Sequence, residues 1–160
     1  MDLGEGEKII KIYHHHPTPF VYMLLKIIAG TTPFFILLFL FKEAFTIWIL
    51  ILLNAIVFLI FALAILYFSL TYWLDRLIIT NKRVIYIDYR GLTIRDEAAT
   101  YLADIQDVNT HELGILSYFK LFDFGTIKLD TPSYAITIEF HDAPDPEGIR
   151  QFIFQVKAQM

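Results

Sequence analysis

The sequence has no cysteine and few charged residues. Among its 160 residues, 19% are charged and none is cysteine. The absence of cysteine excludes disulfides, a thiol nucleophile and any metal site built on thiolates. The charge that is present is mainly acidic, with a net charge of −4 at pH 7. Nucleic-acid binding needs clustered lysine and arginine, so we expect no nucleic-acid partner.

Recognisable catalytic motifs are also missing. The chain has no glycine-rich phosphate loop, no Gly-Lys-Ser/Thr string and no spaced metal-binding motif. Nothing in their spacing connects the few candidate nucleophiles and bases, which are Ser117, Ser133, His111 and His141. Three histidines, 14–16, are adjacent, but consecutive residues do not readily converge on one ion, which favours histidines at a membrane interface. We predict a non-enzymatic protein with no metal and no cofactor.

Long runs without charge dominate the first half of the chain. The segments Phe20–Phe41 and Phe45–Tyr72 are separated only by Lys42, Glu43 and Ala44. The second segment has no charged side chain over 28 residues, roughly 42 Å of helix, which exceeds the hydrocarbon thickness of about 30 Å. Neither segment shows the polar stripe of a soluble amphipathic helix. The sequence therefore predicts a transmembrane helical hairpin over residues 20–72, with the lipid bilayer as its surroundings.

Basic residues flank this hairpin on both sides. They are Lys8, Lys11 and Lys26 on the N-terminal side, and Arg76, Lys82 and Arg83 on the C-terminal side. The turn between the helices carries only Lys42, which Glu43 offsets. Because basic residues favour the cytoplasmic side, we expect a multi-pass protein of the cytoplasmic membrane with both termini in the cytoplasm.

Three residues inside the hairpin are candidates for helix packing. Gly30 would permit close approach of the second helix, and Asn54 would form a hydrogen bond between helices. Pro33 should kink the first helix, and a threonine hydroxyl or a neighbour could satisfy the freed carbonyl. The functional alternatives are a gating hinge at Pro33 and a transport role. Transport usually needs more polar residues within the membrane than this chain has.

After Trp73 the pattern becomes that of short strands. The expected strands are Leu74–Thr80, Arg83–Tyr89, one beginning at Leu92–Arg95, Tyr101–Val108, Thr126–Thr131 and Ala135–Phe140. A final helix should begin with Asp145 as N-cap and Pro146 at its first position. We therefore expect an α+β fold with a polar lead (1–19), the hairpin (20–41 and 45–72) and a domain (73–160).

Several strings in this order resemble one known family. They are Gly6-Glu7-Lys8 and His16-Pro17 before the hairpin, then 75–85, 102–108, 124–127 and 145–149. Together with the hairpin, they resemble the bacterial pleckstrin-homology-like (PH-like) membrane proteins, long of unknown function. The resemblance implies a PH-like fold: a strongly bent seven-stranded sheet, or two packed sheets, closed by the C-terminal helix. It implies no enzymatic activity and no agreed ligand.

The leading functional hypothesis is a membrane-anchored interaction or scaffold module. The domain would bind a protein partner or further copies of itself at the cytoplasmic face. Its candidate interface is an apolar cluster formed by Ile115, Leu116, Tyr118, Phe119 and Phe122. Surplus apolar surface often marks an interface, although the fold could equally cover this cluster internally.

Two alternatives remain open. Four basic residues expected near the membrane end of the first β-hairpin could bind anionic lipid headgroups: Arg76, Lys82, Arg83 and Arg90. Each such group near an anionic leaflet is worth about 1 kcal/mol, although these residues could serve only to set the topology. A third hypothesis, an accessory subunit of a transporter, rests on Pro33 and Asn54 alone.

Overall fold

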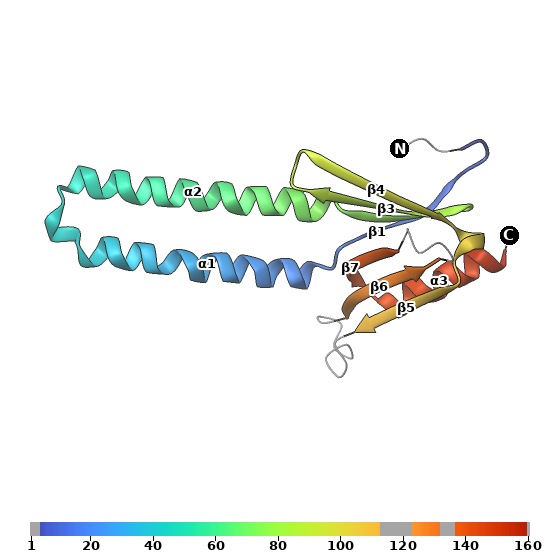
Figure 1. Ribbon diagram of the computed structural model, residues 1–160. Helices are drawn as coiled ribbons and strands as arrows, with labels where there is room; N and C mark the ends of the chain where they lie inside the picture. Colours follow the sequence, from blue (N-terminus) through green and yellow to red (C-terminus); the bar gives the residue numbers. More distant parts are fainter. Residues whose placement is uncertain (1–3, 113–122, 132–136, 160) are drawn as a thin grey trace.

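The chain forms two long helices that extend from one end of a small domain (Figure 1). The computed structural model describes residues 4–112, 123–131 and 137–159. Within these residues the domain consists of a four-stranded and a three-stranded antiparallel sheet, together with a C-terminal helix. The α+β fold expected from the sequence is therefore confirmed.

The hairpin consists of α1 (Pro17–Leu40) and α2 (Ile47–Leu74), joined through a short 3-10 helix, Lys42–Ala44. The helices are 24 and 28 residues long, and no described residue of either is buried. Both are long and apolar enough to cross a membrane. Contiguous apolar surface of this extent is unfavourable in water, which indicates membrane association.

The first sheet contains strands from both sides of the hairpin. Strand β1 (Ile9–His14) precedes α1 and pairs with β2 (Arg76–Thr80), which follows α2. The sheet continues with β3 (Arg83–Arg90) and β4 (Ile94–Tyr101), in the order β1-β2-β3-β4. The helices are therefore inserted between two neighbouring strands, and part of the predicted lead is an edge strand of the domain.

The second sheet contains β5 (Asp107–Glu112), β6 (Phe124–Asp130) and β7 (Ile138–Pro144). A 3-10 helix, Leu102–Asp104, connects the two sheets. The predicted strand Tyr101–Val108 is therefore wrong. Leu102 is fully buried, and the turn that buries it carries the chain from one sheet to the other.

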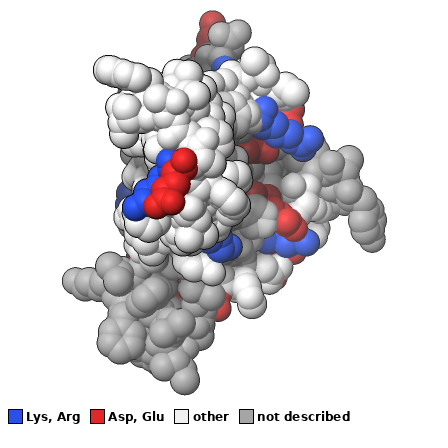
Figure 2. All heavy atoms as spheres, turned by 90° about the vertical axis from the view of Figure 1, so that its left-hand side faces the viewer, with Lys and Arg blue, Asp and Glu red and all other residues white. Residues whose placement is uncertain are grey.

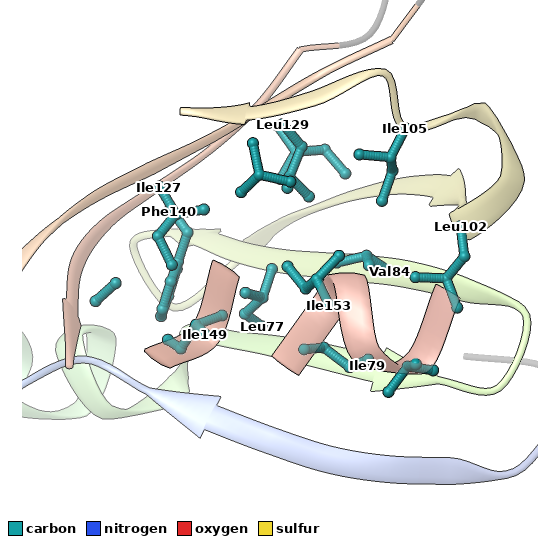
Figure 3. Close-up of a cluster of buried hydrophobic side chains, with 14 residues drawn as sticks. Leu77, Ile79, Val84, Leu102, Ile105, Ile127, Leu129, Phe140, Ile149 and Ile153 are labelled. Carbon is teal, nitrogen blue, oxygen red and sulfur yellow. The ribbon is translucent and has the colours of Figure 1, made fainter. Parts of the chain in front are cut away.

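The core lies between the two sheets and the final helix, α3 (Pro146–Ala158) (Figure 3). Alternate residues of β2 point to opposite faces. Leu77 and Ile79 therefore face this core, whereas Ile78 joins a smaller cluster with Ile85 and Ile87 on the other face. The other sheet contributes Ile127, Leu129 and Phe140, and α3 contributes Ile149 and Ile153.

The cap of α3 agrees with the sequence prediction. Asp145 is the N-cap, and its side chain accepts a hydrogen bond from the Gly148 amide at 2.9 Å. Pro146 occupies the first turn, where a missing amide proton costs nothing. A Cβ at position 148 would overlap the Asp145 carboxylate, so a larger residue there would have to displace the capping side chain.

Candidate functional site

The hairpin joins the domain at a junction of short connections and several side-chain contacts. Only His15 and His16 separate β1 from α1, and only Asp75 separates α2 from β2. Connections of one or two residues leave the helices little freedom relative to the sheet. The orientation of the domain is therefore tied to that of the hairpin.

His15 is the central side chain of this junction. It is only 7% exposed, and its ring lies 4.9 Å from both the Tyr72 and the Phe140 rings, measured between centroids. Its Nδ1 lies 2.7 Å from the His141 carbonyl oxygen, and its Nε2 lies 3.4 Å from Oδ2 of Asp75. Nδ1 must carry a proton to donate a hydrogen bond to a carbonyl. The His15 imidazole therefore joins β7 to the two short connections between the hairpin and the first sheet.

A second set of contacts joins the helix ends to β7. The Tyr72 hydroxyl donates a hydrogen bond to the His16 carbonyl at 2.6 Å, and the His16 amide donates one to the Asp142 carbonyl at 2.7 Å. The His16 Nδ1 accepts a hydrogen bond from the Thr18 amide and so caps α1. Burial lowers the pKa of His16 despite the nearby carboxylates of Asp123 and Asp142, which keeps this capping nitrogen free of a proton.

The His14-His15-His16 run thus serves packing and capping. Adjacent histidines point in different directions: the His14 side chain is exposed, His15 is buried and His16 stacks on Phe124. No group of three or more metal-ligating side chains converges within residues 4–112, 123–131 and 137–159.

The basic residues proposed for lipid binding do not lie together. Strand β2 leads away from α2, so the β2–β3 turn with Lys82 and Arg83 lies at the opposite end of the domain from the hairpin (Figure 1). The expectation that all four lie near the membrane end is therefore wrong. Only Arg76 and Arg90 lie on the hairpin side.

At the far turn, Lys82 and Arg83 bind the N-terminal lead. The Arg83 Nε donates to Oε1 of Glu7 at 2.8 Å, and the Lys82 Nζ donates to the Glu5 carbonyl at 2.6 Å. Burial alone would raise the pKa of Glu7. Hydrogen bonds from Arg83, the Gly4 amide and the Thr80 hydroxyl outweigh it and lower the pKa from 4.5 to about 2. These two cations therefore hold the lead against the domain.

The two basic residues on the hairpin side differ from each other. The Arg90 Nε lies 3.0 Å from the Asp96 carboxylate and 3.9 Å from that of Asp88. The Nε of Arg76 is buried without a hydrogen-bond partner among the described residues. Figure 2 looks onto the hairpin end of the molecule, where the basic side chains are scattered and most lie beside acidic ones. This face has no continuous basic patch among the described residues.

The candidate packing residues of the hairpin behave differently from the prediction. No described atom lies within 4 Å of the position that a Cβ would take at Gly30, so the helices do not approach closely there. The Asn54 amide donates to the Leu50 carbonyl at 2.8 Å within α2. The predicted hydrogen bond between helices is thus replaced by one inside a single helix.

Pro33 lies inside α1, which continues as one helix through it. The hydroxyls of Thr31 and Thr32 both donate to the Ile28 carbonyl, at 2.6 and 3.0 Å. They therefore do not bond the Ala29 carbonyl, the one that Pro33 leaves without its usual amide partner. The proposed interface cluster, Ile115, Leu116, Tyr118, Phe119 and Phe122, lies outside the described residues.

Comparison with known proteins shows the family. The bacterial PH domain family model matches residues 28–157, and this chain belongs to that family. A solved structure of a DUF1696 family protein with a pleckstrin-homology domain from Shewanella loihica PV-4 is similar, with 20% sequence identity and a TM-score of 0.40. The match covers 52% of this chain and 70% of that one. No curated protein matches the chain.

Membership of this family supports a general role as an interaction module. Domains of the PH-like class are generally non-enzymatic, in agreement with the missing catalytic motifs. Sequence reasoning did not identify the junction, because its residues come from three separate parts of the sequence and meet only through the insertion of the hairpin into the sheet. These parts contain His15, then Tyr72 with Asp75, and Asp142. The available signal was that a possible strand, Lys8–Tyr13, stands directly before the hairpin.

Proposed function

We propose that this protein is a membrane-anchored interaction module. Its PH-like domain is held in a fixed orientation at the cytoplasmic face, where it binds a protein partner or a second copy of the chain. The observation that carries the proposal is the junction, in which the one- and two-residue links and the buried His15 connect the sheet to both helices. A domain that only needed tethering would not require two short links.

The free edge of the first sheet supports a protein contact. Within the described residues β1 has a ladder partner only in β2, and it exposes three isoleucines, Ile9, Ile10 and Ile12. An edge strand with unpaired amides and apolar side chains is a common site for strand addition or docking. We add this edge to the predicted interface cluster at 115–122.

The alternative functions have less support. Binding of anionic headgroups needs basic groups that face the leaflet, whereas Lys82 and Arg83 are engaged by the lead and Arg90 is paired with Asp96. A transport role rested on Pro33 and Asn54, and the Asn54 amide bonds its own helix.

The test is the mass of the assembly in native membranes. The full-length protein is extracted with its lipids by a nanodisc-forming polymer. The protein mass of each particle, without lipid and polymer, should exceed that of one chain, 18.7 kDa. A photo-crosslinking residue at Ile12 should give one discrete adduct, and the same residue at Phe154, an exposed position on α3, should give none. A single-chain mass at every concentration, together with no adduct at Ile12, would contradict the proposal.

A further inference from the structure

The tip of the β3–β4 hairpin lies beside α2. Figure 1 shows this turn overlapping the last turns of the helix, and α2 and β3 are in contact. Gly91, with a φ of 75°, lies so close to Tyr67 that an added Cβ would stand 2.5 Å from the hydroxyl oxygen. The turn therefore reaches back along the hairpin and packs against it.

The depth of this contact follows from the helix length. Tyr67 precedes the last residue of α2, Leu74, by seven positions, or roughly 10 Å of helix. Counted from Trp48 near the other end, about 20 residues span a hydrocarbon thickness of about 30 Å. That count ends at Tyr67. With Trp48 at one boundary of the hydrocarbon layer, Tyr67 and the tip beside it are therefore level with the other boundary.

The tip exposes apolar side chains at this level. Leu92, which follows Gly91 in the turn, is 46% exposed, and Ile94, the first residue of β4, is 55% exposed. The flanking charges pair within the hairpin, because Arg90 contacts Asp96 at 3.0 Å and Arg95 contacts Glu97 at 2.6 Å. The exposed feature of the tip is thus apolar, without an unbalanced positive charge.

We infer that the β3–β4 tip enters the interfacial layer of the bilayer that holds α1 and α2, and that Leu92 and Ile94 contact lipid there. This inference rests on the proposed membrane anchoring. The occupant is lipid because the tip is continuous with the exposed apolar wall of α2 at Tyr67. The long arginine side chains beside it can keep their charged ends among the headgroups. The tip would be a third point of attachment, next to the two helices.

Because the chain has no cysteine, single-cysteine labelling tests the inference in the full-length protein. Leu92→Cys carries an environment-sensitive fluorophore in vesicles of phosphatidylcholine alone, which provide no anionic lipid. Tyr101→Cys is the matched control, since Tyr101 is 60% exposed and is the last residue of β4, paired with Arg83 at the end of the domain remote from the hairpin. Phe58→Cys, at a position in the middle of α2 that is 69% exposed, reports whether the helix is in the bilayer.

The label at position 92 should be quenched several-fold more by a shallow lipid-borne nitroxide than the label at position 101. It should also be less accessible to iodide in the water. Ile94→Cys should behave in the same way as Leu92→Cys. These results would support lipid contact without any requirement for anionic headgroups.

Three results would overturn the inference. If position 92 behaves like position 101 while position 58 is quenched by lipid, the tip is in water and only this inference fails. If position 92 is shielded from both quenchers, protein covers the tip and lipid contact is again excluded. If position 58 is not quenched by lipid, the anchoring proposal fails together with the inference.

Discussion

The hairpin and the domain contain similar apolar residues but arrange them in opposite ways. Phe58 of α2 is 69% exposed, whereas Phe140 of β7 is fully buried. In α1 and α2 the apolar residues surround the helix on all sides, as expected when lipid is the solvent. In the domain they alternate along strands and occupy one stripe of α3, so that they pack against each other. The pattern, more than the composition, separates the lipid-facing part from the water-facing part.

The largest effect on stability is expected from a pair of substitutions, one in each region. Phe140→Ala leaves a cavity between the sheets and α3 and should destabilise the domain by roughly 3–5 kcal/mol. Phe58→Ala should change stability by less than about 0.5 kcal/mol, because the side chain packs on no core. Thermal unfolding in detergent, followed by near-ultraviolet circular dichroism, measures both. Equal effects of the two variants would show that the helices have a packed environment of their own.

The second effect concerns the boundary between the regions. His15→Ala removes the ring that joins Asp75, Tyr72 and His141, and should cost roughly 2–3 kcal/mol. Hydrogen exchange should increase in β1 and β7 while the middle of α2 stays protected. His14→Ala, at the neighbouring exposed position, is the matched control and should leave exchange unchanged. Similar exchange in both variants would contradict the role of His15.

Local patterns in the sequence predicted most elements within each region. The uncharged runs predicted the helices, and runs rich in isoleucine, valine, leucine and tyrosine predicted β2 and β3. The predicted strand Thr126–Thr131 covers most of β6, and the alternation that ends at Phe140 predicted the start of β7. Asp145 with Pro146 predicted the start of α3. The strand β4 was predicted only at its beginning, because its middle, Arg95–Ala98, is charged and partly exposed and lacks an apolar alternation.

Relations between the regions were not predictable from local patterns. Pairing of β1 with β2 joins residues on either side of a long insertion, and no spacing rule indicates it. The same limitation applied to the basic residues. Lys82 and Arg83 are close to the hairpin in sequence, but the direction of β2 carries them to the other end of the domain.

A smaller effect on stability is expected at acidic pH, and it arises in the domain. The pKa of Glu7 is lowered from 4.5 to about 2 in the fold, so its ionised form stabilises the native state. That contribution is complete above about pH 4.5 and is lost as the pH falls toward 2. Glu7→Gln should therefore destabilise the protein by roughly 1–2 kcal/mol at neutral pH. The difference from wild type should shrink between about pH 4.5 and pH 2.5.

Urea unfolding across this pH range measures the contribution of Glu7. Glu43→Gln is the matched control, since Glu43 lies exposed in the turn between the helices, and it should leave the free energy of unfolding close to that of wild type. A destabilisation by Glu7→Gln that is the same at every pH would contradict the ionised contact with Arg83.

The smallest effect should come from the exposed ion pair at the tip of the β3–β4 hairpin. Arg90→Gln removes the contact with Asp96, in which both side chains are half or more exposed. Such pairs contribute about 0–1 kcal/mol, and we expect less than about 0.5 kcal/mol. Thermal unfolding at low and high salt checks this value. A loss above about 1 kcal/mol that disappears in high salt would show that charge has a larger role in attaching the tip.

The account depends most on the claim that lipid surrounds α1 and α2. Membranes from cells that express the full chain can be washed with alkaline carbonate and sedimented without detergent. We predict that the protein stays in the pellet and is released only when detergent dissolves the bilayer. Its appearance in the supernatant before detergent is added would contradict membrane anchoring.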